Sequence, residues 1–535
     1  MEGVAKIPAG DLARCPVLLQ SYGMTKVETG SQLEAICSLT ILENASKSSR
    51  KLGALSPSDA VRVTDLATPA EAAHHAAHAP VSADPAGAYE LQEKPPHAGA
   101  EETRAAICAE LSRHPPMAPC DPLVMHGRLF GQLAAAPAPV LPRTTWRSAA
   151  APRDDHDGES WLTASEFEDS KQVMAAKIRQ LAELIRVSRK VSDVPSALLL
   201  ALLLALLLTH LLALKTVLYT GAGISASAIG QAARSGTNVQ GWKKTAGGKK
   251  AVEPTPTHHA LALLGRRGFL QGWVQQNHDG LPQKAGYPQH MINEIHGSWF
   301  DPGNPVVKYS GSLHDRAFPW MEDDTETADL VIVLGTSLGG LTADQVATEP
   351  ARRSCAGASL GAICINLQQT PQDGLMTLRL FGKSDQVLAM LLKGLELGAV
   401  PTKLPAWPTG GRDGPRVLVP YDKHGRRVGE EAPRMWLDLR DQQRVRITPG
   451  HNIQGAQQPH LLHIGASKPY KGKAPGDGTG RVLRREKFFF QLTINGARLD
   501  YGVWWMDAAA RGLVDVLPVV NQRPTYESAR GAGDN

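Results

Sequence analysis

Three short motifs in this sequence have the residue types and spacing needed to bind a nucleotide and to move a proton. The first, Gly221-Ala-Gly-Ile-Ser225, directly follows the apolar run at 216–220. Glycines at such a point allow a tight turn and let backbone N–H groups approach a pyrophosphate. Taken alone, this motif is as often a structural turn as a phosphate site.

The second motif combines amide side chains with a carboxylate. Gln276-Asn277-His278-Asp279 follows the apolar segment at 272–275. Side chains of these types suit hydrogen bonding to ribose hydroxyls and to a carboxamide. The alternative is an Asx-turn, in which Asn277 and Asp279 bond the neighbouring backbone.

The third motif is Glu294-Ile-His296-Gly297. Because histidine exchanges a proton near neutral pH, His296 is a candidate general base, although a lone histidine is more often structural. Two further motifs, Gly335-Thr-Ser-Leu338 and Ile365-Asn-Leu-Gln368, again follow apolar runs.

The apolar runs before these motifs predict a parallel sheet. Strands that alternate with helices indicate a doubly wound α/β arrangement, in which ligands bind beyond the carboxyl ends of the strands. Strands are expected at 216–220, 272–275, 330–334 and 362–365, and helices at 258–264 and 385–395.

An amphipathic helix is expected before the first of these strands. Apolar residues recur at helical spacing from Met174 to about Val187, and Thr163-Ala-Ser-Glu166 has the form of a capping box. Ordered structure is therefore expected to begin near Trp161.

The C-terminal part predicts a small antiparallel β domain. Asn495-Gly496 lies between two alternating apolar runs and is a strong hairpin signal. Trp504-Trp505, on an expected strand, is either a binding surface or, more commonly for such aromatics, part of the core. The strands are expected at 416–419, 435–439, 445–448 and 488–494.

Changes in composition predict the domain boundaries. An Ala/Pro-rich segment with few aromatics cannot bury enough apolar surface to offset chain entropy. The boundaries are 1–160 for a mostly disordered region, 161–397 for the α/β domain with an insertion at 191–215, 398–415 for a linker, 416–521 for the β domain and 522–535 for a disordered tail.

Charge and cysteine usage limit the class of protein. The 57 basic and 52 acidic residues give a net charge of +5, which argues against direct nucleic-acid binding. None of the six cysteines forms a CxxC pair, and the N-terminus lacks the apolar core of a secretory signal. An intracellular protein, cytoplasmic or nuclear, is expected.

The order and spacing of the motifs resemble the sirtuin family. GAGIS is followed by PTPTHHAL at 254–261 and then by QNHDGL, EIHG, GTSL and INLQ, and the resemblance covers about 200 of the 535 residues. It implies a Rossmann-like sheet with a smaller inserted domain, NAD as co-substrate and an acylated protein lysine as second substrate. The implied enzyme is an NAD-dependent protein deacylase, or deacetylase, that transfers the acyl group to ADP-ribose and releases nicotinamide.

The resemblance also assigns residue roles. His296 resembles the base that activates a ribose hydroxyl, and Asn277 and Asp279 resemble the residues of the reacting pocket. Val306 and Val307 resemble the substrate-binding strand. The implied NAD-binding residues are Gly221, Ala222, Gly223, Ser225, Arg234, Gln276, Gly335, Thr336, Ser337, Asn366 and Ser384.

Several positions depart from the family pattern. Gly230–Arg234 replaces the family's Ile-Pro-Asp-Phe-Arg run, so that Ala233 stands where a phenylalanine shields the ribose, and Pro282 replaces a histidine. No cysteine lies between His296 and Leu334, where the family has four zinc ligands. We therefore expect a shortened small domain without zinc. The alternative functions are an NAD-dependent ADP-ribosyltransferase or NAD hydrolase, and a non-catalytic NAD-sensing scaffold.

A leucine-rich run at 197–214 interrupts the resemblance. Its only polar residues are Thr209 and His210, and its length is near the lower limit of roughly 17–20 residues for a membrane span. It is either a true span that anchors the protein to a membrane, an apolar insertion packed on the protein, or a retained intron translated in frame. We favour the intron, because Lys190-Val191-Ser192 can be encoded by a splice-donor sequence and the run adjoins a buried strand.

Overall fold

The computed structural model of this chain divides into two compact units, residues 1–85 with 191–212 and residues 86–190 with 213–535. Within the first unit, β1 (Gln32–Glu34) pairs with β4 (Ala60–Arg62), and β2 (Leu39–Leu42) pairs with β3 (Lys51–Leu55), both antiparallel. The structure describes residues 32–34, 39–42, 51–55, 60–62, 99–119, 121–130, 139–151, 162–188, 215–229, 248–307, 313, 317–407, 414–448 and 478–527.

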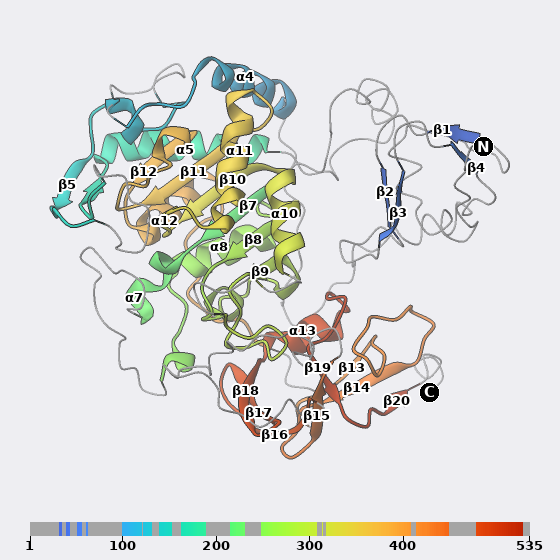
Figure 1. The fold of residues 1–535 in the computed structure, drawn as a ribbon. Helices are drawn as coiled ribbons and strands as arrows, with labels where there is room; N and C mark the ends of the chain where they lie inside the picture. Colours follow the sequence, from blue (N-terminus) through green and yellow to red (C-terminus); the bar gives the residue numbers. More distant parts are fainter. Residues whose placement is uncertain are drawn as a thin grey trace. The chain divides into compact units, whose positions relative to one another are not determined.

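A six-stranded parallel sheet forms the centre of the second unit (Figure 1). Numbered along the chain, its strands run in the order 6-5-4-1-2-3, which is the doubly wound order of dinucleotide-binding folds. The predicted Rossmann-like sheet is confirmed. Across the sheet the strands are β12 (Leu378–Phe381), β11 (Gly361–Asn366), β10 (Ala328–Leu334), β7 (Lys215–Thr220), β8 (Gly272–Gln275) and β9 (Ile292–Glu294).

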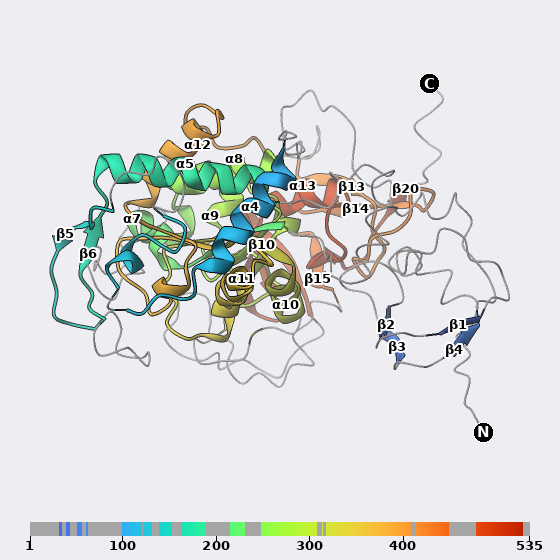
Figure 2. The ribbon, with the colours of Figure 1, turned by 90° about the horizontal axis from the view of Figure 1, so that it is seen from above.

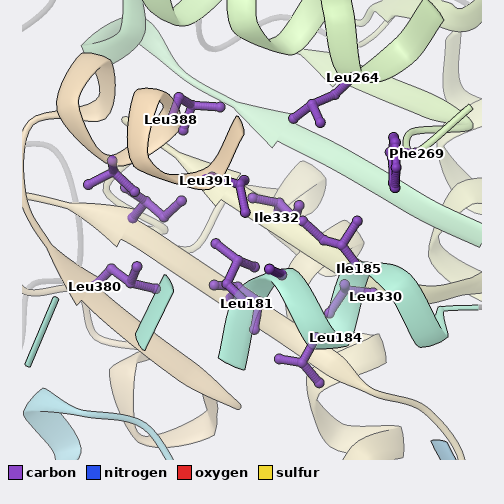
Figure 3. Close-up of a cluster of buried hydrophobic side chains, with 14 of the residues drawn as sticks. Leu181, Leu184, Ile185, Leu264, Phe269, Leu330, Ile332, Leu380, Leu388 and Leu391 are labelled. Atoms are coloured by element: carbon purple, nitrogen blue, oxygen red, sulfur yellow. The ribbon is translucent and has the colours of Figure 1, made fainter. Parts of the chain in front are cut away.

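Helices cover both faces of this sheet (Figure 2). Successive residues of β10 alternate between the two cores, with Leu330 and Ile332 in one and Val331 and Val333 in the other. Figure 3 shows the first core, where leucines of three helices meet β10. Helices α5 (Lys171–Val187), α8 (Pro256–Arg266) and α12 (Ser384–Gly394) cover that face, and α10 (Ala317–Thr327) and α11 (Gln345–Cys355) cover the other.

Helix α5 is the predicted amphipathic helix, but it begins later than expected. Its N-cap is Ser170, whose hydroxyl accepts a hydrogen bond from Val173 N at 3.3 Å. The predicted capping box at Thr163–Glu166 is wrong. Phe167 N donates to the carbonyl of Leu367, which draws this stretch into a short strand, β6 (Glu166–Glu168), paired with β5 (Arg143–Trp146).

Ordered structure also begins earlier than Trp161. Helix α4 (Ala100–Arg113) buries Ile107, Cys108 and Leu111 in the same core as α5, and a turn η1 (Pro122–Met125) follows it. This corrects the expectation for part of the segment 1–160. An average composition over a long Ala/Pro-rich stretch conceals one helix with three buried side chains.

Two antiparallel sheets form the C-terminal part, as predicted. The hairpin turn contains Asn495 and Gly496, both with left-handed backbone (φ 51° and 79°), as a two-residue turn of this class requires. The five-stranded sheet has the order β18 (Ala497–Gly502), β17 (Phe489–Ile494), β16 (Thr479–Arg485), β15 (Arg444–Ile447), β19 (Val519–Asn521), and the three-stranded sheet has β13 (Arg416–Val419), β14 (Arg434–Asp438), β20 (Tyr526–Glu527).

Helix α13 (Trp504–Ala510) follows β18 and contains both tryptophans. Trp504 and Trp505 are each 3% exposed, so the expectation of a strand here is wrong, and both side chains belong to the core. Short helical turns in the connections are η3 (Ala222–Ser225), α7 (Ala226–Ile229), η4 (Lys249–Ala251), α9 (Leu281–Lys284), η5 (Gln289–Met291), η6 (Thr342–Asp344) and η7 (Asp373–Leu375).

Two sequence expectations concern parts of the chain that the structure leaves out. The leucine run at 197–214 and the Gly230–Arg234 loop lie outside the described residues. Among the residues that are described, no helix is long and apolar enough to span a bilayer. In the same residues, no group of three or more His, Cys, Asp or Glu side chains is placed to hold a metal ion.

Candidate active site

Two glycine turns meet where the strand order of the sheet reverses, between β7 and β10. Gly223 N donates to the carbonyl of Gly335 at 2.8 Å. A Cβ on Gly223 would lie 2.7 Å from the Gly335 Cα, and Gly335 itself has φ +60°. Only glycine permits this backbone approach. Crevices at such reversal points are the usual ligand sites of doubly wound sheets.

The loop after β8 is tied to the first glycine turn through Ser225. Asn277 Nδ2 donates to the Gly221 carbonyl and to Ser225 Oγ, both at 3.1 Å. Ser225 Oγ donates to Asp279 Oδ2 at 2.7 Å, and Asp279 Oδ1 accepts from Leu281 N at 3.0 Å. Burial raises the pKa of Asp279, against the hydrogen bonds that lower it. Asp279 therefore makes an Asx-turn bond to Leu281 N, and both Asn277 and Asp279 also bond Ser225, outside their own turn.

His296 lies at the carboxyl end of β9, next to this loop. Its Nδ1 is 3.2 Å from the carbonyl oxygen of Gln276. Because a carbonyl oxygen only accepts, Nδ1 carries the proton and Nε2 keeps a lone pair. Burial lowers the pKa of His296 to about 4, with a further lowering from His278 and an opposing effect of the Gln276 carbonyl. The imidazole is thus neutral at physiological pH and able to take a proton.

His278 is a second neutral imidazole beside the first. Its Nδ1 donates to the Gly297 carbonyl at 3.1 Å, and the centroids of its ring and that of His296 are 6.5 Å apart. Burial lowers the pKa of His278. The sequence analysis gave this residue no role, although its place inside the QNHDGL motif was a usable signal.

Polar side chains connect the ends of β8, β10 and β11. Gln276 Nε2 donates to Thr336 Oγ1 at 3.1 Å, and Asn366 Nδ2 donates to the Thr336 carbonyl at 3.0 Å. Ser337 and Ala222 lie partly exposed beside them. The residues named from four different motifs are thereby brought to one edge of the sheet.

Ser384 lies at the start of α12. The Thr257 hydroxyl, in the first turn of α8, is 2.9 Å from Ser384 Oγ and 2.5 Å from Asp385 Oδ1. These contacts fix the two helix starts to one another.

Val306 and Val307 lie beside the base. Val307 N donates to the His296 carbonyl at 3.0 Å, and Val307 is buried while Val306 is partly exposed. Arg234, the remaining named residue, is outside the described chain.

Glu294, two residues before His296, is a buried carboxyl that sequence reasoning did not single out. Burial raises its pKa to about 8, partly offset by hydrogen bonding to Ser298. Its Oε1 has no partner among the described residues. Burial of this kind has no signature in a single sequence.

Comparison with known proteins places this chain beside NAD-dependent deacetylases. It is 26% identical over 282 residues to "NAD-dependent protein deacetylase SRT1" of Arabidopsis thaliana, covering 44% of this chain and 53% of that protein. It is 27% identical over 301 residues to "NAD-dependent protein deacetylase sirtuin-7" of Rattus norvegicus, covering 47% and 73%. To "NAD-dependent protein deacetylase Sirt6" of Drosophila melanogaster it is 28% identical over 295 residues, covering 45% and 83%. No family model matches the chain.

Solved structures of Sir2 enzymes are also similar. One, described as "Structural Basis for the Mechanism and Regulation of Sir2 Enzymes", covers 41% of this chain and 98% of its own at 22% identity and a TM-score of 0.30. Another, of Sir2Af2 bound to a myristoylated histone peptide, covers 41% and 97% at 22% identity and a TM-score of 0.29. The chain thus spans about half the length of the Arabidopsis relative.

Proposed function

We propose that this chain, a divergent member of the sirtuin family, is an NAD-dependent protein-lysine deacylase. The observation that carries the proposal is the neutral His296, with its Nε2 lone pair available, beside the Asn277–Ser225–Asp279 hydrogen bonds at the sheet's reversal point. The reaction needs a base beside the bound nucleotide, and the reversal point of a doubly wound sheet is the usual place for such a ligand. Similarity to three proteins named as NAD-dependent deacetylases supports the same activity.

The residues at the crevice fit NAD. Gly221, Gly223 and Gly335 carry no side chain where their backbones meet, so a pyrophosphate can approach backbone N–H groups there. In the proposed arrangement Ala222, Ser225, Thr336 and Ser337 adjoin the phosphates. Gln276 serves the nicotinamide ribose, Asn366 the adenosine ribose and Ser384 the adenine. Arg234 is proposed as a further cofactor-binding residue.

When bound, NAD supplies the electrophilic ribose carbon that accepts the acyl oxygen as nicotinamide leaves. In this proposal Asn277 and Asp279 orient the carboxamide, and their positions are supported by the bonds to Ser225. His296 Nε2 takes the proton of a ribose hydroxyl, while Nδ1–H stays bonded to the Gln276 carbonyl. The lowered pKa of His296 supports this role, because the imidazole need not lose a proton first.

The proposed second substrate is an acylated lysine of a protein. Val306 and Val307 are proposed to line its path, since Val307 is hydrogen-bonded to the backbone of His296 itself. A segment held in this way brings a bound peptide close to the base. We propose no zinc for this enzyme, and elemental analysis of the purified protein should find less than stoichiometric metal.

An intracellular location is part of the proposal. Cys108, Cys355 and Cys364 are free thiols in the described structure, and Cys108 and Cys364 are buried. Unpaired cysteines suit a reducing compartment.

Product analysis tests the function directly. Purified full-length protein is incubated with NAD and a panel of acylated peptides, and the products are identified by mass spectrometry. We expect nicotinamide and acyl-ADP-ribose from the wild type, and neither from His296→Ala, with NAD affinity of that variant within about tenfold of wild type, or ~1.4 kcal/mol. ADP-ribosylated protein or free ADP-ribose as the main product would instead identify the transferase or the hydrolase.

A further inference from the structure

The NAD-binding domain and the C-terminal β sheets share one hydrophobic core. Leu281, Trp299 and Phe300, from the loops that follow β8 and β9, are buried together with side chains of β14, β15, β17 and α13. Gly502 N, at the end of β18, donates to the Phe300 carbonyl at 2.9 Å. Figure 1 shows α13 between the β9 side of the large sheet and the C-terminal strands. The C-terminal part is therefore packed directly on the loops that surround His296.

Trp504 makes several of these contacts. Its indole Nε1 donates to Gln289 Oε1 at 2.7 Å, and its ring packs edge-on against Phe300 with centroids 5.3 Å apart. The backbone of Gly280 lies against both rings, because a Cβ there would be 2.7 Å from Phe300 and 3.1 Å from Trp504. Gly280 has φ +61°, a conformation that favours glycine.

Gly280 directly follows Asp279, so the indole supports the loop that holds the proposed carboxamide-binding side chains. Asp279 Oδ1 accepts from Leu281 N, one residue beyond Gly280. Trp299 N, next to Phe300, donates to the His278 carbonyl at 2.9 Å. A shift of Gly280 into space left by the indole would move Asp279 away from Ser225.

Lys284 fixes the far end of the same segment. This buried amine donates to the carbonyls of Lys250 and Val252 at 3.0 and 2.9 Å. Its Nζ also lies 4.9 Å from the centroid of the Phe300 ring and 4.7 Å from the centroid of the Phe488 ring, which belongs to the C-terminal part. The segment from Asp279 to Lys284 is thus held at both ends by aromatic side chains that belong to, or pack against, the C-terminal sheets.

We propose that Trp504 is a positioning residue for the Gln276–Gly280 loop, so that the C-terminal β part completes the NAD site rather than being an appended module. The inference rests on the proposed function only for what the loop binds. The placement of the loop itself is independent of the reaction.

Trp505 provides a matched control for Trp504. It is the next residue of α13, is equally buried at 3%, belongs to the same core and packs on Tyr501 with centroids 6.0 Å apart. The atoms nearest to a Cβ on Gly280 belong to Phe300 and Trp504, not to Trp505. Trp504→Leu and Trp505→Leu therefore remove the same volume from the same helix, and only the first removes support from the loop.

The first measurement is hydrogen–deuterium exchange of full-length protein without ligand. In Trp504→Leu, peptides covering 276–284 should exchange at least about tenfold faster than in wild type, which corresponds to ~1.4 kcal/mol of lost protection. In Trp505→Leu the same peptides should exchange within about twofold of wild type, while peptides of β10 stay protected in both. Equal exchange of the loop in the two variants would overturn the proposal, whatever reaction the protein catalyses.

The second measurement is steady-state kinetics with NAD and an acylated peptide. Trp504→Leu should raise the KM for NAD and the inhibition constant of nicotinamide by about tenfold, and leave the KM for the peptide within about twofold. Trp504→Phe, which keeps a ring against Gly280, should restore most of the NAD affinity even if Trp504→Leu folds poorly. A uniform loss of kcat in both leucine variants, with unchanged KM for NAD, would indicate a purely structural role.

Discussion

At the scale of single residues, the charge of His296 is set by burial. Its pKa is lowered to about 4, mainly by burial, so the imidazole is already neutral at pH 5. We expect kcat/KM for NAD to stay level between about pH 7.5 and 5.5, because no proton must leave His296 in that range. A pH–rate profile with an acid limb near pH 6.5 would contradict this. Assaying each sample again after return to pH 7.5 controls for unfolding.

The raised pKa of Glu294 predicts that its contribution to stability falls as pH rises. A carboxylate with a lowered pKa has the opposite effect. Burial raises the pKa of Glu294 to about 8, well above the ordinary value of 4.5, so the folded state holds a proton that the unfolded state releases. The contribution of the buried, protonated Glu294 to the free energy of unfolding is fully present below about pH 4.5 and is lost as pH rises towards 8. We therefore expect Glu294→Gln, which cannot ionise, to gain stability relative to wild type as pH rises, by up to about 1.4 kcal/mol per pH unit in that window.

Urea unfolding of both proteins at pH 5, 6, 7 and 8 measures this difference. Glu322→Gln is a suitable control, because Glu322 is an exposed carboxylate on α10. A constant difference between Glu294→Gln and wild type across these pH values would show that Glu294 is ionised in the folded protein.

Residue types and spacing indicated that His296, Asn277, Asp279 and the glycine turns follow strands of one sheet, and the structure places them beside one another there. Each motif follows an apolar strand, and parallel strands bring their carboxyl ends to one edge. The supporting residues were not predictable in the same way. His278, Glu294 and Trp504 matter through burial and through contacts across long sequence separations, and a single sequence does not record which side chains are buried together.

At the scale of elements, strands were predicted more reliably than helix starts. The four predicted strands of the large sheet lie within β7, β8, β10 and β11, because continuous apolar runs are typical of strands buried on both faces. Helix α4 and the start of α5 were mispredicted. The first lies in a segment of low average hydrophobicity, and a backbone hydrogen bond to Leu367 makes Phe167 part of a strand instead of a helix cap.

Helix α4 yields a prediction about the stability of the large sheet. Arg104 donates to both carboxylate oxygens of Asp329 in β10, at 3.1 and 2.6 Å, and Asp329 is fully buried. Arg104→Met removes a cation and leaves a buried carboxylate, so we expect a loss of about 3 kcal/mol in the free energy of unfolding. Urea unfolding followed by circular dichroism measures it.

Arg113→Met on the same helix is the control. Arg113 is 71% exposed in its pair with Glu110, so its loss should cost no more than about 0.5 kcal/mol. Similar small losses in the two variants would show that α4 is not a structural part of the α/β core.

At the scale of the whole molecule, the domain boundary predicted from the sequence does not coincide with the limits of a hydrophobic core. The linker predicted at 398–415 divides the sequence into an α/β part and a C-terminal β part. The core that contains Phe300 and Trp504 crosses that boundary. An α/β domain expressed alone would expose Leu281, Trp299 and Phe300, which are now buried. We therefore expect folding and NAD binding to require both parts on one chain.

The final prediction concerns the leucine-rich segment at 197–214. Ser188 and Thr216, which lie on either side of this segment in the sequence, are in contact, since Thr216 Oγ1 donates to Ser188 Oγ at 2.8 Å. Deleting 191–214 leaves three residues between Ser188 and Thr216, enough to span roughly 10 Å. We expect the deleted protein to fold with an unchanged NAD site and higher yield, and we expect transcripts that lack this segment. Sequencing cDNA and comparing NAD affinity of the two proteins check both points. If every transcript retains the segment, and the full-length protein fractionates with membranes and resists carbonate extraction, the run is a membrane anchor and the intron interpretation is wrong.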